Sequence, residues 1–301
     1  MLKLFNKIIL SLIPFLPLSF VRLIAGRYVA GETKEEALDI VQTLNAKGYS
    51  ATIDILGEHV ETNEASKKVT ENYLDLYSEI QSRNLDCNVS IKPTHIGLDI
   101  GETTFRDNLL SLLSKAEETD NFLRIDMENS PFTDVTIKLT QECFSNYKKV
   151  GTVFQAYLFR TKDDIAGMFG PEFNFRLCKG IYKEDPEIAI QNRQEINSNF
   201  IELLRLTFQN KGFAAIATHD LKLLRDVYTL IEELDVPKDR FEFQVLYGVP
   251  MSGWLEKHLS KGYKVRIYVP FGPDWYAYST RRLKENPNIA GYILKNFIRR
   301  S

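Results

Sequence analysis

The sequence has few cysteines and no surplus of either charge. Its three cysteines are Cys87, Cys143 and Cys178, and none of them belongs to a CxxC pair. This odd, widely spaced set argues against a disulfide framework and a cysteine zinc site, and it indicates a reducing, cytoplasmic compartment. The 38 Lys and Arg residues nearly balance the 40 Asp and Glu residues, which gives a formal charge of -2. No general attraction to phosphate backbones results, so nucleic acid is not an expected partner.

Several cofactor and metal motifs are also missing. The chain contains neither GxGxxG nor GxxxxGK[ST], which argues against a Rossmann or P-loop nucleotide site. His95 and His219 belong to no HxxH or HExxH pair, so we expect no zinc or other metal site. A cofactor bound on the rim of a barrel is compatible with these absences.

Long apolar runs are limited to the N-terminus. Residues 8–20 are almost wholly apolar and follow a leader with two lysines, but two prolines interrupt them. The run is too short for a membrane-spanning helix, and no AxA cleavage site of a signal peptide follows it. We therefore assign residues 1–30 to an apolar N-terminal helical arm, which caps the core or lies peripherally at the inner face of a membrane. Residues 31–301 form the predicted catalytic domain.

Short β-branched and aromatic runs alternate with helical periodicity along the rest of the chain. Eight such runs predict strands at residues 51–56, 88–91, 122–127, 152–157, 173–178, 213–218, 241–246 and 265–269. Helical periodicity is found at residues 34–47, 65–82, 108–118, 186–206, 219–234 and 254–259. Alternation of strand and helix predicts parallel strands, and eight units predict an α/β fold that closes into a (βα)8 barrel with its helices outside.

The predicted strand ends are unusually polar. In chain order they carry Glu58, His59, Lys92, Asp126, Glu128, Gln155, Arg176, Lys179, Thr218, His219, Glu242 and Gln244. The working residues of such barrels sit where the strands end and the βα loops begin. Because buried charges need a partner or a function, this rim predicts a binding or catalytic site.

The segment 278–287, YSTRRLKENP, follows the last predicted strand. Side chains at i, i+3, i+4 and i+7 share one face of a helix, and here they are Tyr278, Arg281, Arg282 and Glu285. Two adjacent guanidinium groups braced by a glutamate form a clamp for a carboxylate or a phosphate. The alternative is a solvated helix face with an ordinary salt bridge.

Lys92 and Asp126 each have more than one interpretation. Lys92 could complete an anion site, serve as a Schiff-base nucleophile if its pKa were depressed, or lie at the surface with its ammonium group in water. Asp126 could balance the nearby cations or cap the turn that follows it. The residues alone leave these alternatives open.

Taken together, the motifs resemble the proline dehydrogenase family over residues 27–287. The resemblance rests on seven segments in family order: SIKPT at 90–94, RIDME at 124–128, QAYL at 155–158, RLCKGIY at 176–182, ATH at 217–219, FQVLYG at 243–248 and YSTRRLKENP at 278–287. One match could arise by chance, whereas seven in order could hardly do so. The resemblance is to the monofunctional bacterial type. It implies a distorted (βα)8 TIM-type barrel with a C-terminal helix over its mouth.

The resemblance also implies a bound FAD at the carboxyl ends of the strands. The residues that would contact it are Met127, Gln155, Arg176, Lys179, Gly180, Ile181, Thr218 and His219. The residues that would bind the substrate carboxylate or surround its ring are Lys92, Tyr182, Leu246, Tyr268, Tyr278, Arg281 and Arg282. Asp126 and Glu285 would hold the carboxylate clamp in position. Arg176 would lie near flavin N5 and, with Asp126, is a predicted catalytic residue.

The implied reaction is oxidation of L-proline to 1-pyrroline-5-carboxylate by hydride transfer from substrate C5 to flavin N5. It is the first step of proline degradation to glutamate. A membrane quinone would take the electrons, which would give the apolar arm a role in membrane docking. A separate pyrroline-5-carboxylate dehydrogenase is an expected partner for the product.

Two residues depart from the RLVKGAY pattern usual in the family, Cys178 and Ile181. Ile181 replaces a small residue close to the flavin and the substrate, which could shift the preference toward another cyclic imino acid. Two other functions remain as alternatives. One is a Schiff-base aldolase that uses Lys92 or Lys179, and the other is a non-catalytic amino-acid-binding barrel.

Overall fold

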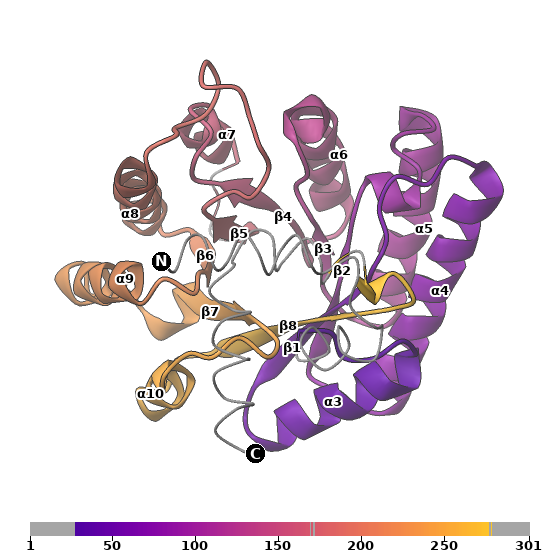
Figure 1. Ribbon diagram of the computed structural model, residues 1–301, viewed down its shortest axis with the longest axis horizontal. Coiled ribbons are helices and arrows are strands. Elements are labelled where there is room, and N and C mark those ends of the chain that lie inside the picture. The colour runs from indigo at the N-terminus through magenta and orange to yellow at the C-terminus, as the bar shows by residue number, and fades with distance from the viewer. Residues whose placement is uncertain (1–27, 169, 171, 277, 279–301) are drawn as a thin grey trace, which may run out of the picture.

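The computed structural model describes residues 28–168, 170, 172–276 and 278. Eight parallel strands close into one barrel in the order β1 to β8, and β8 pairs with β1 (Figure 1). The strands are β1 (Ser50–Ile55), β2 (Cys87–Ile91), β3 (Leu123–Ile125), β4 (Val150–Gln155), β5 (Asn174–Cys178), β6 (Phe213–Ala217), β7 (Phe241–Leu246) and β8 (Val265–Phe271). The predicted eight-stranded barrel is therefore confirmed.

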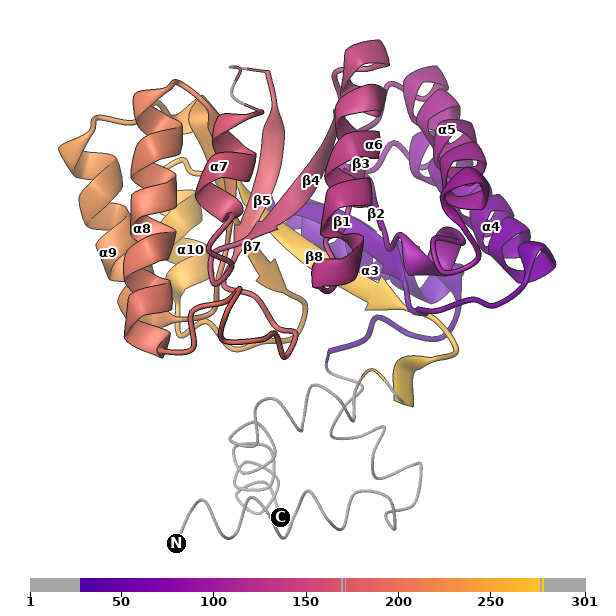
Figure 2. The ribbon, with the colours of Figure 1, turned by 90° about the horizontal axis from the view of Figure 1, so that it is seen from above.

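Helices surround the strands on the outside of the barrel (Figures 1 and 2). They are α3 (Lys34–Ala46), α4 (Asn63–Ser82), α5 (Glu102–Glu118), α6 (Thr133–Asn146), α7 (Thr161–Ala166), α8 (Arg193–Gln209), α9 (Leu221–Glu233) and α10 (Trp254–Ser260). Within the described residues, short 3-10 turns lie at Thr94–Ile96, Ser130–Phe132 and Lys238–Arg240. None of the described helices has the length and apolar character needed to cross a membrane.

The start of α9 illustrates how local sequence places a helix at the barrel mouth. Asp220 is the N-cap residue, and its carboxylate accepts hydrogen bonds from the backbone N–H groups of Lys222 and Leu223 at 3.0 and 3.3 Å. Apolar residues at helical spacing, such as Leu224 and Val227, are buried against the barrel. The cap therefore fixes where α9 begins, directly after β6.

The apolar core lies between the strands and the helices, whereas the inside of the barrel is polar. Arg124 on β3 is 1% exposed and donates to the carbonyl oxygens of Thr152 and Asn174 at 2.7 and 2.8 Å. Arg266 on β8 donates to Glu242 on β7 at 2.9 Å. These buried charges have hydrogen-bond partners, as burial requires.

The helices of the structure differ from the predicted ones in two ways. The segment 186–206 was expected to be one helix, but α8 begins only at Arg193, after the N-cap residue Asn192. The preceding residues form a loop because their backbone pairs with the loop after β4: Ile190 N–H donates to Tyr157 at 2.7 Å, and Phe159 N–H donates to Ile188 at 3.0 Å. Helices α6 and α7 were not predicted. Most of the predicted arm (1–30) and the predicted C-terminal helix beyond Tyr278 lie outside the described residues.

Candidate active site

A cavity of about 490 Å³ opens where the strands end. The described residues that were predicted to contact substrate or FAD all line it: Lys92, Asp126, Met127, Gln155, Arg176, Lys179, Gly180, Ile181, Tyr182, Thr218, His219, Leu246, Tyr268 and Tyr278. Of the polar residues at the predicted strand ends, His59, Glu128 and Glu242 do not line it. The structure thus brings together side chains from seven strand ends or the loops after them. Three further predicted residues, Arg281, Arg282 and Glu285, lie outside the described residues.

Lys92 follows β2 and is held between two carboxylates. Its Nζ lies 2.5 Å from Asp54 Oδ2 and 3.9 Å from Asp126 Oδ2. Burial alone would lower the pKa of Lys92, but the charges of Asp54 and Asp126 raise it above its ordinary value. Lys92 is therefore a fixed cation at neutral pH and not the depressed amine that a Schiff-base nucleophile needs.

Asp126, directly after β3, accepts hydrogen bonds from three neighbours. Ser90 Oγ donates to Oδ1 at 2.6 Å, Tyr268 OH donates to Oδ2 at 2.9 Å, and Arg176 Nη1 donates to Oδ1 at 2.7 Å. Burial alone would raise the pKa of Asp126, but the charges of Arg176 and Lys92 hold it below its ordinary value. Asp126 is therefore an ionised bridge between Lys92 and Arg176, and not merely the cap of a turn.

Arg176 on β5 has one nitrogen without a hydrogen-bond partner. Its Nε donates to Gln244 Oε1 at 2.5 Å, and its Nη1 donates to Asp126. The guanidinium carbon lies 5.0 Å from the centre of the Tyr268 ring, within the range of a cation–π contact. Its Nη2 is buried and finds no acceptor within the described part of the chain. A buried donor of this kind indicates a ligand in the cavity.

Another ion pair of the cavity joins the residue after β5 to the N-cap of α9. Lys179 Nζ lies 2.6 Å from Asp220 Oδ2, the residue that caps α9. His219 Nε2 accepts the backbone N–H of Leu246 at 2.8 Å. Because a backbone N–H can only donate, neutral His219 carries its proton on Nδ1. Arg193 Nη2 lies 3.8 Å from the Asp220 carboxylate and also lines the cavity. This part of the cavity therefore has two cations and an oriented imidazole.

Gly180 packs so closely against Tyr157 that no residue with a side chain fits at this position. Its φ of +106° is a conformation that side chains rarely adopt, and a Cβ atom there would come within 2.3 Å of the Tyr157 ring. The backbone after β5 therefore lies flat against Tyr157 and lines the cavity. The next residue, Ile181, is 52% exposed on the cavity wall, which is unusual for a large apolar side chain.

The sequence did not predict which side chains pair with Lys92, Arg176 and Lys179 in the cavity. Asp54 lies within an apolar run on β1, and nothing in that run indicated its ion pair with Lys92. Glu242 and Gln244 were noted as polar strand residues, but their contacts with Arg176 and Arg266 depend on strand register. The position of Asp220 could have been predicted, because an Asp directly before a helical run indicates an N-cap.

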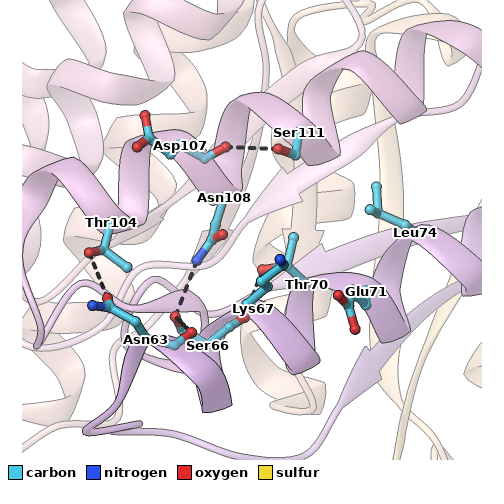
Figure 3. Close-up of a pocket in the computed structure, with 10 residues that line it drawn as sticks. All are labelled: Asn63, Ser66, Lys67, Thr70, Glu71, Leu74, Thr104, Asp107, Asn108 and Ser111. Carbon is cyan, nitrogen blue, oxygen red and sulfur yellow. Dashed lines mark hydrogen bonds between the residues drawn. The ribbon is translucent and has the colours of Figure 1, made fainter.

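A second hollow of about 440 Å³ lies outside the barrel, between α4 and α5 (Figure 3). Hydrogen bonds cross it from Thr104 to Asn63 at 3.1 Å and from Asn108 to Ser66 at 3.3 Å. These contacts explain the hollow as the seam between two packed helices. The strand ends, where barrels place their chemistry, lie elsewhere.

A closed parallel barrel with an ion-paired cavity at the carboxyl ends of its strands is the architecture in which barrel enzymes place their active sites. Comparison with known sequences gives the family. The model of the proline dehydrogenase family matches residues 37–293, and the chain therefore belongs to that family. It is 37% identical to proline dehydrogenase 1 of Bacillus subtilis (strain 168) over 280 residues, which cover 93% of this chain and 92% of that protein. It is 32% identical to proline dehydrogenase of Deinococcus radiodurans, over 92% of this chain and 90% of that protein.

Solved structures agree on the fold. Proline utilization A from Bdellovibrio bacteriovorus, inactivated by N-propargylglycine, superposes with a TM-score of 0.80 at 24% identity. The match covers 88% of this chain and 32% of that longer chain. A variant of proline utilization A from Bradyrhizobium japonicum gives a TM-score of 0.72 at 20% identity, over 86% of this chain and 30% of that one.

Proposed function

We propose that this protein oxidises L-proline to 1-pyrroline-5-carboxylate, the first step of proline degradation to glutamate. The observation that carries the proposal is the cavity at the strand ends, where the cation Lys92, the bridging Asp126 and the partly unpaired Arg176 converge. The family membership and the 37% identity to a proline dehydrogenase over nearly the whole chain support the same reaction.

The residues of the cavity fit an FAD cofactor. The Nη2 of Arg176 is a buried donor with no acceptor among the described residues, and Gly180 lines the cavity without a side chain. Together with these two, the residues that would hold FAD are Met127, Gln155, Lys179, Ile181, Thr218 and His219. When bound, FAD supplies the acceptor of two electrons.

The substrate carboxylate would bind at Lys92, with Arg281 and Arg282 as further ligands and Glu285 as their brace. Asp126 accepts a hydrogen bond from Arg176 and lies 3.9 Å from Lys92, so both cations are already oriented when the substrate binds. The residues that would surround the ring are Tyr182, Leu246, Tyr268 and Tyr278. Fixing the carboxylate in this way orients C5, which loses a hydride while the ring nitrogen loses a proton.

Electrons would leave to a quinone, and the product would pass to a pyrroline-5-carboxylate dehydrogenase. The apolar residues 8–20 support peripheral contact with a membrane, where quinones dissolve. Deletion of residues 1–26 should therefore reduce binding to phospholipid vesicles. Unchanged binding would remove the membrane contact from the proposal.

A Schiff-base aldolase on the same barrel has less support. Lys92 has a raised pKa, and Lys179 is paired with Asp220 at 2.6 Å. Borohydride with a carbonyl substrate should therefore trap no covalent adduct. A non-catalytic amino-acid-binding barrel would bind proline without turnover.

The assay for the proposal is reduction of an electron-accepting dye by purified protein with L-proline. We expect proline-dependent dye reduction, formation of a pyrroline product, and one FAD released per chain on denaturation. Lys92→Met should lower the apparent affinity for proline while FAD stays bound, because it removes a ligand of the substrate carboxylate. It also leaves the buried Asp54 without its cation, so the thermal midpoint is measured on the same samples. Protein that binds FAD but reduces no dye with proline would contradict the proposed substrate.

A further inference from the structure

Gln244 on β7 joins two charged groups that do not touch each other. Its Oε1 accepts Arg176 Nε at 2.5 Å, and its Nε2 donates to Glu242 Oε1 at 2.6 Å. All three side chains are buried, at 7% exposure or less. The amide therefore has a defined polarity, with its oxygen toward Arg176 and its nitrogen toward Glu242.

The charge of Glu242 determines which end of the Gln244 amide faces it. Burial alone would raise the pKa of Glu242, but the charges of Arg266 and Lys264 hold it below its ordinary value. Arg266 Nε donates to the same oxygen, Oε1, at 2.9 Å. An ionised carboxylate only accepts, so a reversed Gln244 amide would place two acceptors together in the barrel interior.

Two alanines on β6 allow this contact to form across a strand. In the sheet register, Ala215 lies beside Arg176 on one side and beside Glu242 on the other. Ala217, two residues later, pairs with Gln244 and lines the cavity, so Ala215 faces the same interior. With only a methyl group on β6, Arg176 reaches β7.

We infer that Glu242, acting through Gln244, is a positioning residue that sets the orientation of the Arg176 guanidinium. Gln244 fixes Nε and Asp126 fixes Nη1, so the planar group cannot turn about its axis. Nη2 is buried and has no acceptor among the described residues. Glu242 itself does not line the cavity, and its effect on catalysis passes entirely through the amide. The catalytic readout of this inference rests on the proposed function.

The first test uses the protein without substrate. Hydrogen exchange of Arg176 Nε–H is followed by NMR in the wild type, in Glu242→Gln and in Lys264→Gln. Glu242→Gln keeps the shape of the side chain but lets the Gln244 amide reverse, and it should speed exchange about 10-fold, the equivalent of one charge-assisted hydrogen bond. Lys264→Gln is the control, because it removes a charge 3.9 Å from Glu242 but no hydrogen bond to Gln244. Arg266 still pairs with Glu242 at 2.9 Å, so exchange should stay at the wild-type rate. Equal exchange in the wild type and Glu242→Gln would overturn the inference.

The second test exchanges the two residues. Gln244→Glu alone places two carboxylates in contact, and kcat with proline should fall about 10- to 100-fold, as is typical when a supporting partner is lost. In the double variant Glu242→Gln/Gln244→Glu, the amide at 242 donates to the carboxylate at 244, which still accepts from Arg176. We expect the double variant to recover most of the lost kcat and the wild-type thermal midpoint.

Recovery of the thermal midpoint without recovery of kcat would mean that the pair only stabilises the barrel, and this would contradict the positioning role. If the wild-type protein binds no FAD and oxidises no proline, the proposed function fails. The exchange of Arg176 Nε–H then decides the inference by itself.

Discussion

Asp126 is the side chain that links two cations of the cavity, Lys92 and Arg176. Asp126→Asn removes the charge that holds both and places an NH₂ group against one of its donors. We expect kcat/KM for proline to fall about 10- to 100-fold, the usual cost of losing a residue that orients a binding group. Steady-state kinetics test this, with FAD content measured on the same samples. Asp120→Asn, at an exposed ion pair with Lys149, is the control and should leave kcat/KM unchanged.

Ile181 is a large apolar side chain on the cavity wall. Ile181→Ala should widen the cavity and raise kcat/KM for larger cyclic imino acids relative to proline by about 10-fold, since a few methylenes change discrimination by about 1–3 kcal/mol. Competition between proline and its six-membered homologue measures the ratio. An unchanged ratio would show that Ile181 does not contact the substrate.

Single residues differed in how far the sequence could predict them. Lys92 and Asp126 were identified as candidates because they stand at strand ends, where barrels place chemistry. Asp54 was missed because its neighbours read as an ordinary buried strand, and its role depends on the reach of Lys92 from β2 back to β1. Such contacts are set by register and side-chain length, which a single sequence does not encode locally.

Strand β4 contains a glycine, Gly151, where the backbone of β5 packs too closely for a side chain. A Cβ atom on Gly151 would lie 1.8 Å from the backbone oxygen of Asn174 and 3.0 Å from Arg124 Nη1. Gly151→Ala should therefore destabilise the protein by about 1–3 kcal/mol or more, because backbone must move to relieve the overlap. Gly167→Ala is the matched control, since its Cβ would meet nothing closer than 3.5 Å. Urea unfolding of both variants measures the difference, and equal midpoints would contradict the account.

At the same scale, strands were easier to predict than helices. Each buried strand is a short β-rich run, and all eight were found. Helix α6 was missed because TDVTIKLTQECFSN is rich in β-branched residues, whose helix propensity is low. Its helical state comes from packing on the barrel, which buries Leu139 and Cys143. The start of α8 was misplaced because long-range pairing with the β4 loop competes with local propensity.

For the whole molecule, the buried histidines predict how stability depends on pH. Burial and the charge of Lys92 lower the pKa of His95 to about 4, and burial and the charge of Lys257 do the same for His258. Both stay neutral in the folded chain but become protonated at about pH 6.5 when the chain unfolds. Below that pH the unfolded state binds more protons than the folded state. The contribution of the two neutral histidines to the free energy of unfolding is therefore fully present above pH 6.5 and is lost as the pH falls toward 4. Each histidine contributes up to about 1.4 kcal/mol per pH unit.

Unfolding free energies measured by urea at pH 7 and pH 5 test this linkage. His258→Phe keeps an aromatic ring against Phe243, where the ring centres are 3.8 Å apart, and removes one titrating group. The loss of stability between the two pH values should shrink by up to about 1.4 kcal/mol per pH unit in this variant. Equal losses in the variant and the wild type would contradict the linkage.

We propose that the cavity at the strand ends holds a flavin that takes electrons from proline. The most direct measurement is the visible absorption spectrum of the purified protein, recorded without oxygen before and after L-proline is added. We predict a flavin band that bleaches with L-proline, and that bleaches far more slowly in Asp126→Asn. A flavin band that proline leaves unchanged, or protein that holds no flavin after reconstitution with FAD, would contradict the account.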